Sequence, residues 1–172
     1  MGFGGATLLE IGCGVGNLHQ TLLEKGAHTA SGIDLAPAML SEARDWADKR
    51  GLGGRVNYLE GDFVELDDKV AMADICLLDK VVCCYPDAQG LLRKATAKTR
   101  RAFALTYPRD RWFVELGVGA WNSLLWLIRS DFRTYVHEPA RVESWIVGDG
   151  LEKCYEGRTA GWLTQVFVRR DH

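Results

Sequence analysis

The sequence predicts an α/β fold, with a doubly wound, mostly parallel sheet of seven strands, helices on both faces and an antiparallel β-hairpin at the C-terminal end. Three observations predict it. Short apolar runs alternate with helical segments along most of the chain, as in consecutive β-α-β units. A glycine-rich turn separates the first strand from the first helix. Near the C-terminus, two strand-like runs flank a glycine-containing turn, which is typical of a hairpin.

Five short apolar runs, each bounded by turn residues, predict the first five strands. They are residues 7–11, 28–33, 56–59, 73–78 and 101–106. The segment between the third and fourth strands suits only a short or poorly formed helix. Residues 86–99 suit a helix that turns Leu91, Leu92 and Ala95 toward the sheet.

Two further helices are expected between the first three strands. Leu18, Leu22 and Leu23 recur at helical spacing before Gly26, which is a natural helix stop. Pro37 opens the next helix, which ends at Gly51. Its predicted inward positions are Leu40, Ala43, Trp46 and Ala47.

The β-α alternation ends after the fifth strand. Residues 111–128 are long, apolar and rich in tryptophan, residues 132–137 follow, and a helix is expected over 139–148 before the hairpin. We interpret residues 109–137 as an insertion that caps a substrate pocket. It equally suits a helix that only covers the sheet or forms a homodimer, whereas a membrane-surface role is disfavoured because it lacks a lysine-rich polar face.

Composition narrows the range of functions. The 172 residues suit one domain over residues 1–172, in which helices before the first strand are expected to be missing. A net charge of −2 with scattered basic residues disfavours nucleic-acid binding. Five cysteines without a Cys-x-x-Cys pair and four dispersed histidines predict a reducing, cytoplasmic location and no metal. No leader and no membrane-spanning stretch are apparent.

The glycine turn, Gly12-Cys13-Gly14-Val15-Gly16-Asn17, indicates the ligand class. Bare backbone here lets a ligand approach closely. A dinucleotide turn carries a third small residue where Asn17 stands, and Glu10 would repel a pyrophosphate. Asp34 ends the second strand at the distance where a carboxylate binds ribose hydroxyls. The ligand therefore has a ribose and no required phosphate, which S-adenosylmethionine satisfies.

With these features the sequence resembles the class I, Rossmann-like S-adenosylmethionine-dependent methyltransferases. "LLEIGCGVG" is similar to their first motif, "GIDLA" to the second, "EGDF" to the third and "ADICLLDKVVCCYP" to the fourth-strand motif. The resemblance covers nearly the whole chain, including the terminal hairpin. More loosely, "CCYPD", "LTYPRD" and "TAGWLTQVFV" are similar to the magnesium-protoporphyrin and ubiquinone-type O-methyltransferases.

The resemblance implies a set of cofactor residues. Glu10 and the glycine backbone would hold the methionine portion, Asp34 the ribose, and Leu35, Met39, Asp62 and Phe63 the adenine. The full set is Glu10, Gly12, Cys13, Gly14, Gly16, Asp34, Leu35, Met39, Gly61, Asp62, Phe63 and Asp79. The plainer interpretations are that the glycines form only a tight turn, and that Asp34 and Asp62 are only strand-end and turn residues.

The methyl acceptor is expected beside the cofactor, at the carboxyl ends of the fourth and fifth strands. Candidate substrate residues there are Lys80, Tyr85, Tyr107, Arg109 and His137, and none is assigned as a base. "LLDKVVCCYPD" lacks the Asn/Asp-Pro-Pro-aromatic tetrapeptide of DNA and protein-amide N-methyltransferases. Oxygen, carbon or sulfur on a small molecule is therefore favoured, with oxygen or carbon as the expected acceptor atom. The tryptophan-rich residues 111–128 favour a hydrophobic or aromatic compound.

Two alternatives remain open. A domain of this fold that keeps the cofactor site and lacks acceptor chemistry would be a non-catalytic binding or regulatory module. An NAD-binding oxidoreductase is a further alternative, which Glu10 and Asn17 disfavour.

Overall fold

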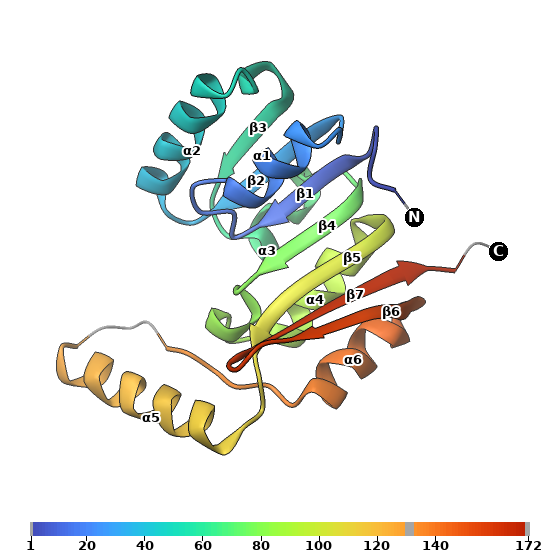
Figure 1. Cartoon of the computed structure of the whole chain (residues 1–172). Coiled ribbons are helices and arrows are strands. Elements are labelled where there is room, and N and C mark those ends of the chain that lie inside the picture. Colours follow the sequence, from blue (N-terminus) through green and yellow to red (C-terminus); the bar gives the residue numbers. More distant parts are fainter. Residues whose placement is uncertain (1, 130–132, 171–172) are drawn as a thin grey trace.

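The computed structural model describes residues 2–129 and 133–170 and contains a seven-stranded sheet in the order β3-β2-β1-β4-β5-β7-β6 (Figure 1). The first five strands run parallel, and β7 pairs antiparallel with both β5 and β6. The strands are β1 (Thr7–Ile11), β2 (Thr29–Asp34), β3 (Val56–Glu60), β4 (Ala73–Asp79), β5 (Thr99–Pro108), β6 (Leu151–Arg158) and β7 (Trp162–Arg169). The predicted fold class and hairpin are confirmed.

The predicted helices are also present, with adjusted ends. They are α1 (Asn17–Glu24), α2 (Pro37–Lys49), α3 (Phe63–Leu66), α4 (Ala88–Ala97), α5 (Trp112–Leu127) and α6 (Pro139–Gly148), with 3₁₀ turns η1 (Gly53–Arg55), η2 (Asp67–Lys69) and η3 (Val82–Cys84). Helix α4 begins later than predicted because Asp87 is its N-cap, accepting a hydrogen bond from the Gly90 amide at 2.9 Å. None of the described helices is long and apolar enough to cross a membrane.

Alternate residues of the strands feed two apolar layers, one on each face of the sheet. Leu9 and Ile11 of β1 join the larger layer, which contains buried residues of α3, α4 and α6. Leu8 of β1 joins the smaller layer, with Leu23 of α1 and Ala47 of α2. Helices therefore cover both faces, as predicted.

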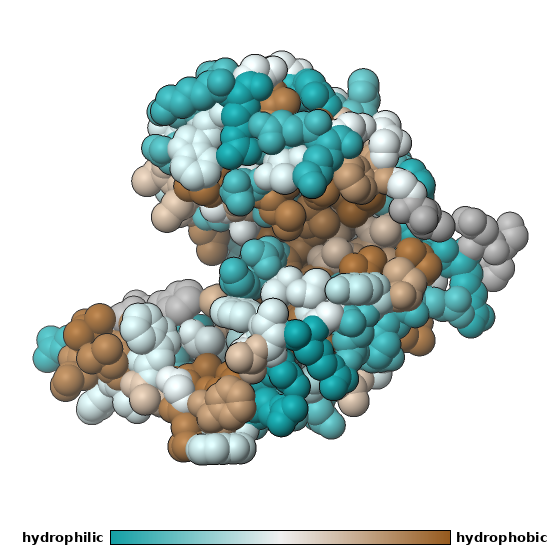
Figure 2. All heavy atoms as spheres, viewed as in Figure 1, coloured by the Kyte–Doolittle hydropathy of each residue, from teal (hydrophilic) through white to brown (hydrophobic). Residues whose placement is uncertain are grey.

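Part of the sheet is left uncovered on the α1 and α2 side. A groove of about 420 Å³ lies there, bounded by apolar side chains of β4, β5 and β7 such as Ile75, Ala104 and Val166. Figure 2 shows this apolar surface between the α1/α2 part of the molecule and the hairpin. Helix α5 lies away from the sheet, beyond the carboxyl end of β5 (Figure 1).

Candidate functional site

The candidate site lies where the carboxyl ends of the parallel strands meet. The chain leaves β1 for α1 on one face, and the chain that leaves β4 continues to α4 on the other face (Figure 1). Ligands of open α/β sheets bind at such a switch point between adjacent strands. The glycine loop, Asp34 and Asp79 all stand at this edge, as the ends of β1, β2 and β4 require.

The glycine loop after β1 depends on glycine at three positions. Gly12, Gly14 and Gly16 have φ of 65°, 53° and 75°, the left-handed region that other residues rarely adopt. A Cβ on Gly12 would lie 2.4 Å from Cγ2 of Val81. A Cβ on Gly14 would meet no atom within 4 Å, so the loop at this point borders open space.

Asp34 ties this loop to the end of β2. One carboxylate oxygen accepts the Gly14 amide at 2.8 Å, and the other accepts the Ala36 amide at 2.9 Å. Each oxygen retains lone pairs for further donors. The structure shows that Asp34 fixes the glycine loop, and its contact with a ribose stays a prediction.

A small cavity of about 50 Å³ joins many of the predicted cofactor residues. From the predictions it brings together Gly12, Asp34, Leu35, Gly61, Asp62, Phe63 and Tyr85, and it adds Ile11, Ile33, Val81 and Leu91. Most ligand pockets exceed about 300 Å³, so a nucleoside would extend from this cavity across the open edge of the sheet. The side chains of Leu35 and Met39 are 67% and 47% exposed there.

Asp62 is held from two directions. Its Oδ1 accepts the Val64 amide at 2.8 Å, which starts α3. The Tyr85 hydroxyl lies 3.0 and 2.9 Å from its two carboxylate oxygens and donates to them. Burial, and then the Asp62 carboxylate, raise the pKa of Tyr85 to about 12. Tyr85, a predicted substrate residue, thus contacts Asp62, the residue predicted to bind the adenine amino group.

Glu10 lies behind the glycine loop rather than in this cavity. Its carboxylate is nearly fully buried, 2.5 Å from Nδ1 of His19, and it accepts the His19 amide at 3.1 Å. His19 and Gln20, which the sequence analysis missed, are the buried positions of α1 together with Leu23. Leu18 and Leu22, whose spacing predicted this helix, are only half-buried. A buried carboxylate needs such partners.

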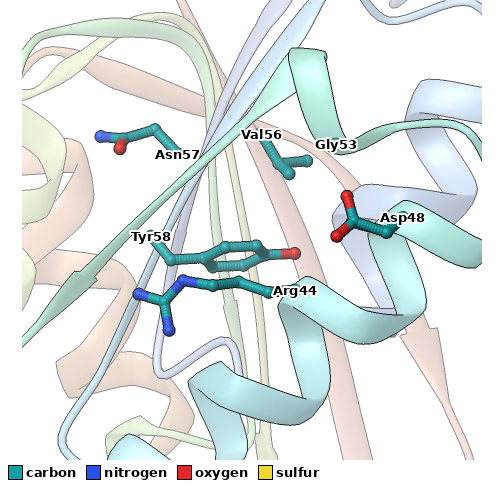
Figure 3. A pocket seen from close by; sticks show the side chains of 7 residues that line it. Arg44, Asp48, Gly53, Val56, Asn57 and Tyr58 are labelled. Atoms are coloured by element: carbon teal, nitrogen blue, oxygen red, sulfur yellow. The ribbon is translucent and has the colours of Figure 1, made fainter.

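The same buried polar cluster reaches a second cavity, between α2 and β3 (Figure 3). Tyr58 lines this cavity, and its hydroxyl lies 3.0 Å from Nε2 of His19 and accepts a hydrogen bond from Nε2 of Gln20 at 2.9 Å. The cavity measures about 250 Å³, and Figure 3 shows Arg44 alongside the Tyr58 ring, 5.7 Å from its centroid. None of the predicted site residues lines it, so it is not the candidate site.

A third cavity, of about 400 Å³, lies at the carboxyl ends of β4 and β5, where the sequence predicts the methyl acceptor, and we call it the acceptor cavity. Its walls come from four parts of the chain. They are Lys80, Cys83, Cys84, Pro108, Val114, Val118, Thr134, Gly161 and Trp162. Val114 and Val118 belong to α5, so this helix contributes to the wall of the cavity, and its role as a cap over a substrate stays a prediction.

Polar groups line one side of this acceptor cavity. Nζ of Lys80 is 5.2 Å from the Trp162 ring centroid and 3.8 Å from Oδ2 of Asp79. The sulfur atoms of Cys83 and Cys84 are 3.6 Å apart. A hydrogen bond with Cys83 lowers the pKa of the Cys84 thiol to about 7. The same hydrogen bond, together with burial, raises the pKa of the Cys83 thiol.

Besides Tyr85, which borders the small cavity, three predicted substrate residues lie outside this cavity. Tyr107 is fully buried and donates to Oε1 of Gln165 at 2.8 Å, so its hydroxyl is part of the core and does not reach a ligand. The Arg109 guanidinium donates to the Thr159 carbonyl in the hairpin turn. His137 holds Nε2 3.1 Å from the Val82 carbonyl, and burial lowers its pKa. A carbonyl only accepts, so Nε2 carries the proton.

Cys13 contributes backbone only. Its side chain is 6% exposed and faces Gly32, where an added Cβ would lie 2.8 Å from the sulfur. Burial raises the pKa of this thiol to about 12. Within the described part of the chain, no three histidine, cysteine, aspartate or glutamate side chains gather as a metal site.

Comparison with known proteins gives a family match and longer relatives. The model of a methyltransferase domain family matches residues 8–102. The chain is 31% identical over 163 residues to ubiquinone biosynthesis O-methyltransferase of Azorhizobium caulinodans, covering 86% of this chain and 59% of that protein. It is 36% identical over 95 residues to ribosomal protein L11 methyltransferase of Edwardsiella ictaluri, covering 51% of this chain and 32% of that protein.

Solved structures show the same fold. Magnesium protoporphyrin IX methyltransferase from Synechocystis with bound SAH has a TM-score of 0.79 at 21% identity, covering 98% of this chain and 76% of that one. An O-methyltransferase family 2 protein from Planctomyces limnophilus in complex with apigenin has a TM-score of 0.77 at 20% identity, covering 97% of this chain and 50% of that one.

Proposed function

Because the chain belongs to the methyltransferase domain family, we propose that it transfers a methyl group from S-adenosylmethionine to a small-molecule acceptor. The favoured acceptor atom is oxygen or carbon on a hydrophobic or aromatic compound. The observation that carries the proposal is the convergence of the glycine loop, Asp34 and Asp62 on the sheet edge that also borders the cavity beneath α5.

The residues present fit this cofactor. The Gly14 backbone borders open space that a side chain would fill, which suits close approach of a ligand. Asp34 keeps acceptor capacity for ribose hydroxyls, and Leu35 offers an exposed apolar side chain for the adenine. When bound, S-adenosylmethionine supplies an electrophilic methyl group on a positively charged sulfur. Asp62, fixed by Tyr85, would accept the adenine amino group.

The acceptor cavity favours positioning over acid-base chemistry. Val114, Val118 and Trp162 provide apolar walls against which a ring would pack. Lys80 and Cys84 are the polar groups that would orient an acceptor oxygen. A base is needed only for an acceptor that must lose a proton, and no residue is assigned this role.

A protein acceptor is the second candidate, since the relatives include ribosomal protein L11 methyltransferases. Two observations favour the small molecule. The match to the ubiquinone biosynthesis enzyme spans 86% of this chain, against 51% for the L11 enzyme. The largely apolar walls of the acceptor cavity also suit an apolar ring better than a polar peptide backbone.

Calorimetry and a transfer assay test the proposal. S-adenosylhomocysteine is expected to bind, and NADH is not; the reverse result would overturn the cofactor assignment. The protein and labelled S-adenosylmethionine are then incubated with small-molecule extracts and, in a separate reaction, with ribosomal proteins. Label in the small-molecule fraction is the expected result. Label only in protein would replace the acceptor class, and cofactor binding without any transfer would indicate a binding module.

A further inference from the structure

Lys80 holds a backbone conformation that a lysine disfavours. Its φ is 62°, in the left-handed region that glycine adopts readily and most other residues avoid. The neighbouring backbone fixes this conformation, because the Lys80 amide donates to the Thr106 carbonyl at 2.8 Å and the Lys80 carbonyl accepts the Cys83 thiol at 3.3 Å. A glycine would make the same contacts with less strain. Strained residues of this kind cluster at functional sites, so the reason for a lysine here lies in its side chain.

The Lys80 side chain brings a positive charge to the acceptor cavity. Its Nζ is 5.2 Å from the ring centroid of Trp162, and both residues line the cavity. Among the described residues that line it, Lys80 is the only basic one, and none is an aspartate or a glutamate. Arg109, the other basic residue predicted at the acceptor, donates to the Thr159 carbonyl instead. The cavity therefore offers one ammonium group beside apolar walls.

The Asp79 carboxylate beside Lys80 leaves this ammonium group available. Its Oδ2 is 3.8 Å from Nζ, and the side chains of Lys80 and Asp79 are 52% and 40% exposed. Ion pairs with this exposure contribute little to stability, so a ligand can compete with Asp79. An ammonium group carries three donors, and Asp79 itself does not line the cavity. A ligand oxygen can therefore bind Nζ from the cavity side.

Lys80 also stands at the junction of the two halves of the site. It directly follows Asp79, the last residue of β4. The next residue, Val81, lines the small cavity together with Gly12 and Asp34. Two consecutive residues thus border the cofactor side and the acceptor side, and a group bound at Nζ would lie close to the proposed methyl donor.

We propose that Lys80 selects a methyl acceptor that carries a carboxylate on an aromatic ring. The carboxylate would bind Nζ, and the ring would pack against Val114 and Val118. A single ammonium group suits a singly charged carboxylate, whereas a phosphate favours several donors. The inference rests on the proposed function only in naming the bound compound as the methyl acceptor.

Calorimetry of the full chain with two matched probes tests the proposal. Naphthoate carries a carboxylate on an apolar ring system, and naphthamide has nearly the same shape without the charge. Each is titrated with and without saturating S-adenosylhomocysteine, below the Cys84 pKa of about 7 so that this thiol is neutral. Naphthoate is expected to bind about fivefold or more tighter than naphthamide, and added salt is expected to reduce this ratio.

Three substitutions of Lys80 separate its charge from its effect on folding. Lys80→Gln is expected to abolish the preference for naphthoate without weakening naphthamide binding, and Lys80→Arg is expected to keep the preference. Lys80→Gly should also lose the preference, yet its melting temperature should be no lower than that of the wild type, because glycine suits a φ of 62°. Lys49→Gln, at the exposed C-terminal end of α2, is the matched control and should retain the preference.

Three results would overturn the proposal: equal binding of the two probes by the wild type, binding of neither probe, or a preference that persists in Lys80→Gln. A lower melting temperature of Lys80→Gly would also overturn it, because the lysine would then serve folding. The titrations with S-adenosylhomocysteine test the proposed function separately. If this compound does not bind while the naphthoate preference persists and depends on Lys80, the cofactor assignment fails and the carboxylate site stands.

Discussion

Replacing Asp34 by alanine tests the central contact of the cofactor site. The wild-type carboxylate accepts two backbone amides, Gly14 at 2.8 Å and Ala36 at 2.9 Å, and it would also accept ribose hydroxyls. Hydrogen bonds to a charged acceptor contribute about 1.5 to 3 kcal/mol each, and water replaces part of this at a half-buried site. We expect the ligand-free variant to lose about 1 to 2 kcal/mol of stability.

Cofactor binding should fall further, since the loop loosens and the ribose loses its acceptor. A loss of about 1 to 3 kcal/mol corresponds to a 5- to 150-fold weaker dissociation constant for S-adenosylhomocysteine, measured by calorimetry. Glu60→Ala is the matched control, because Glu60 is the exposed residue opposite Asp34 in the β2–β3 register and carries the same charge. Unchanged affinity in Asp34→Ala, or an equal loss in Glu60→Ala, would refute the assignment.

Three other substitutions test separate parts of the structure. Gly14→Ala should abolish S-adenosylhomocysteine binding in calorimetry, because its added methyl group would occupy the open space expected to hold the ligand. Gly12→Ala should chiefly lower the melting temperature, because its methyl group would clash with the Val81 side chain. Tyr107→Phe should cost about 1 to 2 kcal/mol in denaturant unfolding, since Gln165 loses its buried donor, and should leave cofactor affinity unchanged. The Cys84 thiolate forms as the pH rises through about 7, so iodoacetamide labelling should accelerate there, and Cys84→Ser should remove this fast phase.

The cofactor half of the site was predictable because its chemistry is local in sequence. Gly12, Gly14 and Asp34 belong to one β-α-β unit, in which strand ends and glycine conformation fix their positions. The contact between Tyr85 and Asp62 joins segments 23 residues apart, and no local pattern specifies it. Its discovery required the structure.

Two features of the fold have clear physical causes that the sequence analysis did not use. Leucine spacing predicts α1 but does not show that His19 faces inward, where it partners the buried Glu10 carboxylate. Tyr107 was predicted at the acceptor, yet the period of two along β5 puts it on the same face as Phe103 and Leu105, in the core. That alternation was visible in the sequence and outweighs proximity to the strand end.

The acceptor half resists prediction for a different reason. Lys80 follows β4, Pro108 ends β5, Val114 lies in α5 and Trp162 begins β7, so the cavity is assembled from segments distant in sequence. A change in any one of them alters its shape without touching the glycine loop. The methyl donor can therefore be inferred from one continuous stretch, whereas the acceptor depends on how α5 and the hairpin meet, which only the folded chain defines.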